Sequence, residues 1–143
     1  MKPRVLLLAG MLNDTRVWAP VAQLLQAHCE TRSVAFLAQA SVVEMAKHAW
    51  LVTSDMQPGQ PLALAGFSMG GYVAQAMIAN PKRKIDALAL IGSSIRAETE
   101  ETRSNRLKTL RAIENDFSAL VDQAARWGSH PSKHSDALHM QSL

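Results

Sequence analysis

The most constraining feature of the sequence is a regular alternation of short, largely apolar runs with segments that place apolar residues at helical spacing. The runs are typical of strands in a buried parallel sheet, and the segments between them are typical of crossover helices. The expected strands are residues 5–9, 31–36, 61–67 and 85–91, and the expected helices are residues 17–28, 42–50 and 69–80. This order predicts an α/β fold with about four parallel strands.

Three local signals support these helices. Pro20 suits a first helical turn, where its missing N–H would have no partner. Ser41 and Glu44 have the spacing of a capping box, in which the serine oxygen accepts from the backbone and the glutamate reaches back. Pro81 marks the end of the third helix, because proline cannot continue the backbone hydrogen bonds.

The last third of the chain has a different character. Residues 98–127 contain no strand signal, and their apolar residues follow a helical stripe among charged ones. Asn115-Asp116 is a point at which this stretch can divide into two helices, and the tail that follows is polar and rich in histidine and serine. We therefore expect a core in residues 1–96 and a helical region with a polar tail in residues 97–143.

Composition excludes several functional classes. The 48% of hydrophobic residues suffices for a core, and the formal charge of +3 comes from scattered basic residues, which argues against a nucleic-acid surface. The single cysteine, Cys29, excludes an internal disulfide and a thiolate-based metal site. The apolar run at residues 5–9 is too short for a membrane span. We expect a cytoplasmic protein that binds neither nucleic acid nor membrane.

The segment Gly66-Phe67-Ser68-Met69-Gly70 has the Gly-x-Ser-x-Gly pattern and joins an expected strand to an expected helix. In that context the serine takes a strained conformation and points out at the carboxyl edge of the sheet. The two glycines let neighbouring backbone pass close without a Cβ clash. The N–H of Met69 would lie at a helix start, where a negative charge is favoured. Ser68 is therefore the candidate nucleophile.

A second feature agrees with this assignment. The first expected strand ends in Ala9-Gly10-Met11, and the loop after it comes in the right order to supply a second donor to an oxyanion. The alternative is a glycine-rich turn in a nonhydrolytic doubly wound fold. A dinucleotide site is disfavoured because the chain contains no Gly-x-Gly-x-x-Gly.

With these motifs, residues 4–96 resemble the N-terminal half of an α/β-hydrolase of the small esterase, enol-lactonase and C–C hydrolase kind. The segments that carry the resemblance are residues 6–12, 17–21, 64–74 and 88–91. The resemblance implies a cofactor-free serine hydrolase that acts on a small ester, lactone or related acyl substrate. It implies that the backbone N–H groups of Met11 and Met69 form the oxyanion hole. It also implies that residues 97–143 begin a helical cap.

Two further expectations concern what such an enzyme needs beyond Ser68. The family's first strand usually ends in His-Gly, whereas this one ends in Ala9-Gly10. The family's acid and histidine follow the nucleophile in chain order, after the cap. Because this sequence ends within the expected cap, we expect it to be truncated relative to the family, and weakly active or inactive.

No residue of the chain is a convincing substitute for the missing acid or histidine. Asp86 is expected at the amino end of its strand, which is the wrong edge, and Gly92-Ser93-Ser94 occupy the place where some relatives carry the acid. In the polar tail, Pro131 argues against a histidine metal site. The other candidates are assigned to helix caps, the surface, packing or the polar tail: Asp116, Asp122, His28, His48, His130, His134, His139, Trp18 and Tyr72.

Two other interpretations remain open. The chain could be a noncatalytic protein that binds a small molecule or a partner in the same pocket, or it could be a pseudogene product without a function. Under any of these interpretations, a truncated sheet would end at the unpaired outer edge of the strand expected at residues 85–91. Such an edge is a site for self-association or partner binding.

Overall fold

The computed structural model describes residues 1–136, and it divides the chain into two compact units, Met1–Ile95 and a second that begins at Arg96. The first unit is built on a four-stranded parallel sheet with the order β2-β1-β3-β4. Its strands are β1 (Arg4–Leu8), β2 (Glu30–Val34), β3 (Leu62–Phe67) and β4 (Ala87–Ile91). The expected parallel sheet with crossover helices is thus confirmed.

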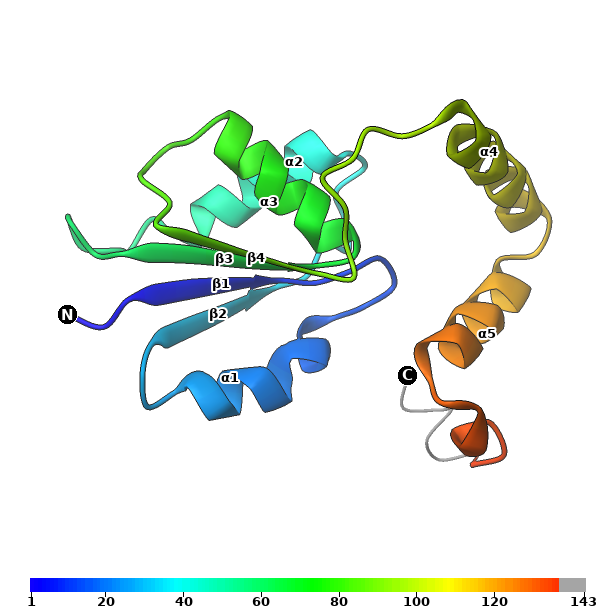
Figure 1. The fold of residues 1–143 in the computed structure, drawn as a ribbon, viewed down its shortest axis with the longest axis horizontal. Coiled ribbons are helices and arrows are strands. Elements are labelled where there is room, and N and C mark those ends of the chain that lie inside the picture. The colour runs from blue at the N-terminus through cyan, green and yellow to red at the C-terminus, as the bar shows by residue number, and fades with distance from the viewer. Residues whose placement is uncertain (137–143) are drawn as a thin grey trace. The chain divides into compact units, whose positions relative to one another are not determined.

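Helices cover both faces of this sheet (Figure 1), with α2 and α3 on one face and α1 on the other. The elements are the 3-10 helix η1 (Thr15–Trp18), α1 (Ala19–Leu25), α2 (Val42–Leu51) and α3 (Met69–Ala79). The single helix expected at residues 17–28 is therefore wrong in its extent. Asp14 starts η1 early by accepting the Arg16 N–H at 2.8 Å, and turns follow Leu25.

The core explains why β1 is apolar at every position after Arg4. Leu6 and Leu8 lie in a large cluster with residues of α2 and α3, whereas Leu7 lies in a smaller cluster with Trp18 and Ala65. All three leucines of β1 are completely buried. A central strand covered on both faces requires such a continuous apolar run.

The strand order creates a switch point between β1 and β3. The chain leaves β1 toward β2 on one side, and it leaves β3 toward β4 on the other. Ligands of open α/β sheets bind in the crevice outside the carboxyl ends of strands at such a point. Because Leu8 pairs with Gly66 in the parallel register, the segments after both strands emerge at this same edge.

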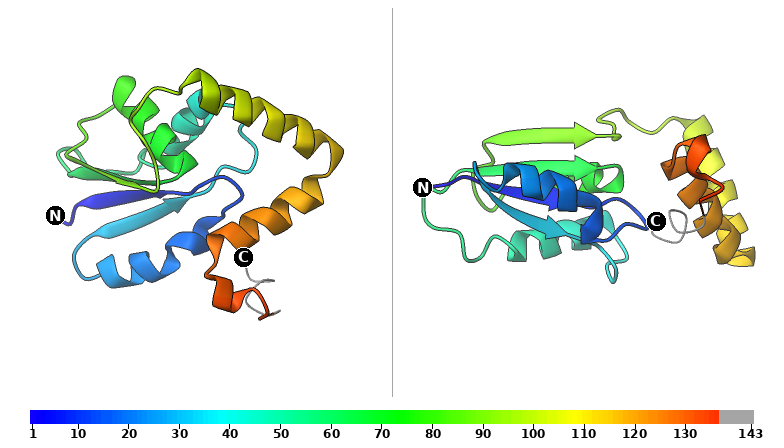
Figure 2. Two further views of the ribbon diagram at one scale, coloured as in Figure 1. Left: turned by 45° about the vertical axis from the view of Figure 1, so that its right-hand side comes forward. Right: turned by 90° about the horizontal axis from the view of Figure 1, so that it is seen from below.

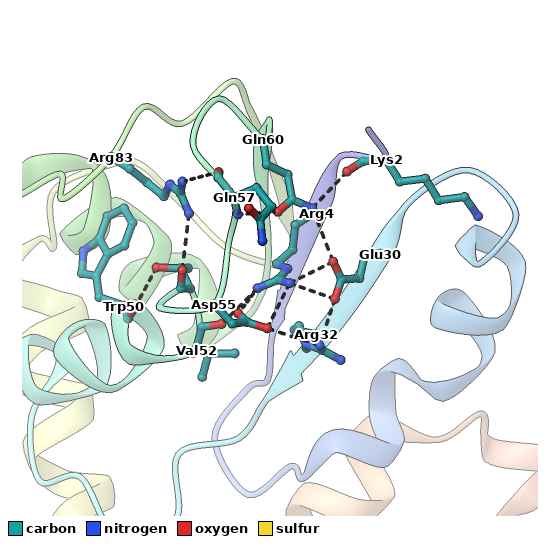
Figure 3. Close-up of polar contacts among 11 residues, drawn as sticks. Lys2, Arg4, Glu30, Arg32, Trp50, Val52, Asp55, Gln57, Gln60 and Arg83 are labelled. Carbon is teal, nitrogen blue, oxygen red and sulfur yellow. Dashed lines mark hydrogen bonds and ion pairs between the residues drawn. The ribbon is translucent and has the colours of Figure 1, made fainter.

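The amino edge of the sheet carries a cluster of charged residues around Arg4 (Figure 3). The Arg4 side chain is only 4% exposed and forms an ion pair with Glu30 at 2.9 Å and another with Asp55. Arg32 adds an ion pair to Glu30 at 2.9 Å and one to Asp55 at 3.6 Å. The cluster links β1, β2 and the loop before β3 at the edge opposite the switch point.

The second unit is helical in its described part. It contains α4 (Glu100–Asn115), α5 (Phe117–Gly128) and the 3-10 turn η2 (Pro131–Lys133). The expected division at Asn115-Asp116 is confirmed, because Asp116 caps α5 by accepting the Ala119 N–H at 2.9 Å. Within residues 1–136 no helix is both long enough and apolar enough to cross a bilayer.

Candidate functional site

Ser68 lies in a strained turn between the last residue of β3 and the first residue of α3. Its backbone angles are φ 50° and ψ −115°, a conformation that residues with a Cβ rarely adopt. The Ser68 N–H donates to the Ile91 carbonyl at 2.9 Å, and the Ser68 carbonyl accepts the Gly71 N–H at 3.0 Å. Hydrogen bonds on both sides of the residue therefore hold the turn.

The flanking glycines are sterically required, as the sequence predicts. A Cβ on Gly70 would overlap the backbone carbonyls of Leu8 and Ala9 at the end of β1. A Cβ on Gly66 would overlap the backbone where α3 begins. The strand, the turn and the first helical turn can pack this closely only because neither residue has a side chain.

The loop after β1 contains a second strained residue. Leu12 has φ 61°, and it is the one non-glycine residue besides Ser68 with a positive φ in the described part of the chain. At Gly10, where this loop begins, there is no room for a side chain, since a Cβ there would lie 2.8 Å from Asn13 Oδ1 and 3.1 Å from Phe67 Cδ1. Backbone strain thus occurs twice, at the ends of the neighbouring strands β1 and β3. Such strain clusters at functional sites.

Two backbone donors at this edge have no hydrogen-bond partner. Neither the Met11 N–H nor the Met69 N–H bonds to another residue within 1–136. The Met69 N–H belongs to the first turn of α3, an 11-residue helix whose amino end favours negative charge. Both groups are therefore chemically available to a ligand oxygen. The family resemblance names both residues as oxyanion donors, and this role stays a prediction.

From the sequence, Ser93 was noted only for its place after the fourth strand, and its packing beside the Ser68 turn was not predicted. Its Oγ is buried without a hydrogen-bond partner and fills the space that Gly71 leaves open beside the turn. Gln75 Nε2 bridges the same two segments by donating to the Ser94 carbonyl at 2.9 Å and to the Gly71 carbonyl at 3.2 Å. In the sequence, the glycine at position 71, next to Gly70, was the signal that could have indicated the close approach of Ser93 to α3.

Asp86 lies away from Ser68, as expected. It precedes β4 at the amino end, where its Oδ2 accepts the Leu62 N–H at 3.0 Å and its Oδ1 pairs with Lys84 at 2.5 Å. The Lys84 ammonium, followed by the Leu62 N–H, lowers the pKa of this carboxyl below its usual range. Asp86 is therefore a structural carboxylate of the opposite edge.

The other candidates of the first unit have packing or surface roles. Trp18 is buried in the smaller core cluster, whereas His28 lies exposed in the turn after α1 and Tyr72 is exposed on α3. The His48 ring on α2 is partly buried and meets Phe36 edge-on at a centroid distance of 6.5 Å. The Ser68 side chain makes no hydrogen bond to any residue that the structure describes.

The histidines of the second unit have local partners. His130 Nδ1 lies 2.9 Å from Ser132 Oγ, and His134 Nε2 lies 2.9 Å from the Arg126 carbonyl oxygen. Among residues 1–136, no three His, Cys, Asp or Glu side chains gather in a way that could hold a metal ion. Asp122 is exposed on α5, and His139 lies outside the described residues.

Comparison with known proteins identifies a matching family and a similar solved structure. A family model described as "Serine aminopeptidase, S33" matches residues 34–138. Among solved structures, the chain is similar to a thermophilic esterase from Thermogutta terrifontis with malate bound, at 19% identity and a TM-score of 0.72. That alignment covers 98% of this chain and 58% of the esterase chain. No curated protein matches the sequence.

Proposed function

Since the chain belongs to the serine aminopeptidase (S33) family of α/β-hydrolases, we propose that Ser68 is the nucleophile of an acyl hydrolase. The observation that carries this proposal is the turn itself, with φ 50° at Ser68 and an N–H on the next residue, Met69, that has no partner within residues 1–136. A strained serine at the switch point of a parallel sheet has the placement that the Gly-x-Ser-x-Gly turn gives to the nucleophile of α/β-hydrolases.

The proposed reaction is acyl transfer through Ser68. The Ser68 Oγ attacks the substrate carbonyl carbon, its proton passes to a base, and the carbonyl oxygen becomes an oxyanion. The N–H groups of Met11 and Met69 donate to that oxyanion and stabilise the transition state. Collapse expels the alcohol or amine, which takes up a proton, and leaves an acyl-serine that water then hydrolyses.

The reaction also needs a base and an acid that orients it, and no described residue provides either of them at Ser68. In the family's chain order both follow the nucleophile. The chain spans 58% of the length of the similar esterase, and we propose that the base and the acid of the whole protein come from residues other than 1–136. The family match therefore supports an acyl-hydrolase role for the whole protein.

For the substrate we propose a small ester, lactone or related acyl compound. Esters and amides pass through the same type of tetrahedral oxyanion, so the two N–H donors suit either bond. The family's name adds an aminoacyl amide as a specific competitor. Comparing the rates at which the whole protein hydrolyses p-nitrophenyl acetate and an aminoacyl p-nitroanilide separates ester substrates from aminoacyl amides.

A noncatalytic binding protein is the second candidate. It is favoured by one observation, the absence of a hydrogen bond between the Ser68 hydroxyl and any residue in the described part of the chain. In this case the same edge would hold a small ligand through the Met11 and Met69 N–H groups, without bond cleavage.

A fluorophosphonate probe distinguishes the two candidates, because it requires a single attack and no turnover, and the oxyanion donors favour that attack, though slowly, even where no base lies at the serine. We expect the intact mass of the folded chain to increase by one adduct over hours. The Ser68→Ala variant, shown to be folded by circular dichroism, should gain none. A folded wild-type chain that remains unlabelled at saturating probe would overturn the nucleophile assignment and favour the binding protein.

A further inference from the structure

The carboxyl edge of the sheet, at which all four parallel strands end (Figure 2), is followed by segments without a charged residue. These segments are residues 9–13 after β1, 35–43 after β2, 68–81 after β3 and 92–95 after β4. The amino edge is different, because the cluster around Arg4 and the ion pair of Lys84 with Asp86 lie there. The uncharged edge is the one that contains Ser68.

The first carboxylates that follow β1 and β2 along the chain already have local partners. Asp14 accepts the Arg16 backbone N–H at 2.8 Å and pairs with the Arg16 side chain at 2.8 Å. Glu44 accepts the Ala40 N–H at 2.9 Å. A substrate group that carries an ammonium would need a carboxylate to replace its water. The segments at this edge therefore suit an uncharged substrate group better than a cationic one.

At the same edge, Leu12 combines a strained backbone with a side chain that contributes little to the core. Its φ of 61° costs a leucine about 1–3 kcal/mol, whereas glycine adopts this conformation freely. Packing within residues 1–136 offsets little of that cost, because the side chain is 43% exposed and belongs to neither core cluster. Strain that the fold itself does not require is typical of a ligand-binding position.

The loop that carries Leu12 is a hydrogen-bonded turn beside the end of β3. The Asn13 N–H donates to the Gly10 carbonyl at 3.3 Å, and a positive φ at the third residue of the four is the feature of type II turns. Gly10 packs against Phe67, the last residue of β3, so closely that a Cβ would not fit. Leu12 is thus held on a short, defined loop, next to the proposed oxyanion donor Met11.

We propose that Leu12 is a specificity-determining residue, whose side chain contacts an uncharged, apolar group of the substrate next to the bond that is cleaved. The side chain of Met11, which is 61% exposed, extends the same apolar surface. Contact with this surface removes apolar substrate area from water and favours alkyl groups over groups that carry an ammonium. The inference rests on the proposed role of Ser68 as the nucleophile, and it selects apolar esters over aminoacyl amides.

The test compares two fluorophosphonates of equal length, one with a butyl group and one with a 3-aminopropyl group. The rate at which each modifies Ser68 in the folded chain is followed by intact mass. We expect the wild type to react with the butyl probe at least about fourfold faster, which is the effect of one buried methylene. The ratio of the two rates is the readout, because damage to the loop as a whole would slow both probes alike.

Four variants, each shown to be folded by circular dichroism, assign this preference to one side chain. Leu12→Ala removes the side chain and keeps the strain, whereas Leu12→Gly removes both, and in each the ratio should fall toward one. Leu12→Met should keep the ratio of the wild type. So should the control Leu24→Ala, which removes a leucine that is 79% exposed on α1.

The outcomes separate this inference from the proposed function. Equal labelling of the wild type by both probes would overturn the role of Leu12 and leave Ser68 as the nucleophile. A preference for the butyl probe that Leu12→Ala and Leu12→Gly leave unchanged would do the same. No labelling of the folded wild type by either probe would contradict the proposed nucleophile, and the role of Leu12 with it.

Discussion

At the scale of the residue, the two non-glycine positive-φ positions of the described chain lie at the carboxyl ends of β1 and β3. Ser68 and Leu12 both take conformations that cost about 1–3 kcal/mol each. The glycines around them permit close backbone packing, and the hydrogen bond from the Ser68 N–H to the Ile91 carbonyl holds the turn. Stability is thus given up at the place where we propose the chemistry to occur.

This strain predicts the effect of removing the Ser68 side chain in two ways. Ser68→Ala keeps the Cβ and its strain, whereas Ser68→Gly relieves it. We expect the free energy of unfolding of Ser68→Gly to exceed that of Ser68→Ala by about 1 kcal/mol, after allowance for the greater freedom of glycine in the unfolded chain. Urea denaturation measures this difference. A glycine variant no more stable than the alanine variant would show that the turn is unstrained.

At this scale, a residue's conformation could be predicted when the contacts that determine it are close in sequence. The strained turn at Ser68 and the close packing at Gly66 and Gly70 could be predicted because the strand, turn and helix lie within one short segment. Leucine carries no sequence signal for a positive φ, so the conformation of Leu12 could not be predicted. For the buried hydroxyl of Ser93 the sequence offered only the glycine at position 71 as a signal, because the contact depends on the segment after β4 packing against α3, a tertiary contact.

At the scale of the element, the cluster around Arg4 joins β1, β2 and the loop before β3 through ion pairs between side chains. Hydrogen bonds from Arg4 are the main cause of the lowered pKa of both Asp55 and Glu30. A carboxyl whose pKa is lowered on folding stabilises the fold above its unfolded pKa. That contribution is lost as the pH falls through the folded value.

We therefore predict that Arg4→Met is less stable than the wild type at pH 7 and depends less on pH between about 5 and 3, the range in which unfolded carboxyls titrate. The control is Arg16→Met, because the pKa of Asp14 is lowered first by the Arg16 backbone N–H, which that variant keeps. Thermal unfolding across this pH series measures the effect. Parallel pH profiles for Arg4→Met and the wild type would contradict it.

Element-scale predictions succeeded wherever a segment's own pattern determined its structure. The capping box at Ser41 is present, since its Oγ accepts the Glu44 N–H at 3.2 Å. The glutamate reaches back to the Ala40 N–H at 2.9 Å, one residue before the cap. The helix expected at residues 17–28 was too long because the side chain of Asp14 starts a 3-10 turn that competes with the α-helix. Apolar spacing does not reveal such a turn.

At the scale of the whole molecule, the chain combines the proposed nucleophile Ser68 with two proposed oxyanion donors, and no described residue places a base at the serine. Removing a triad member costs several orders of magnitude in rate and leaves only the contribution of the oxyanion hole and binding. We predict that this 143-residue chain hydrolyses p-nitrophenyl acetate at or near the background rate, with little change in Ser68→Ala. Robust turnover that depends on Ser68 would contradict this prediction.

The most direct test of the account is to find which hydroxyl of the folded chain reacts. The chain should be treated with a fluorophosphonate, digested, and analysed by peptide mass spectrometry for the residue that carries the adduct. We predict that the adduct lies on Ser68, in preference to Ser93 and Ser94, and that prior unfolding in urea abolishes this preference. Equal modification of the three serines, or the same pattern before and after unfolding, would contradict the assignment of Ser68 as the nucleophile.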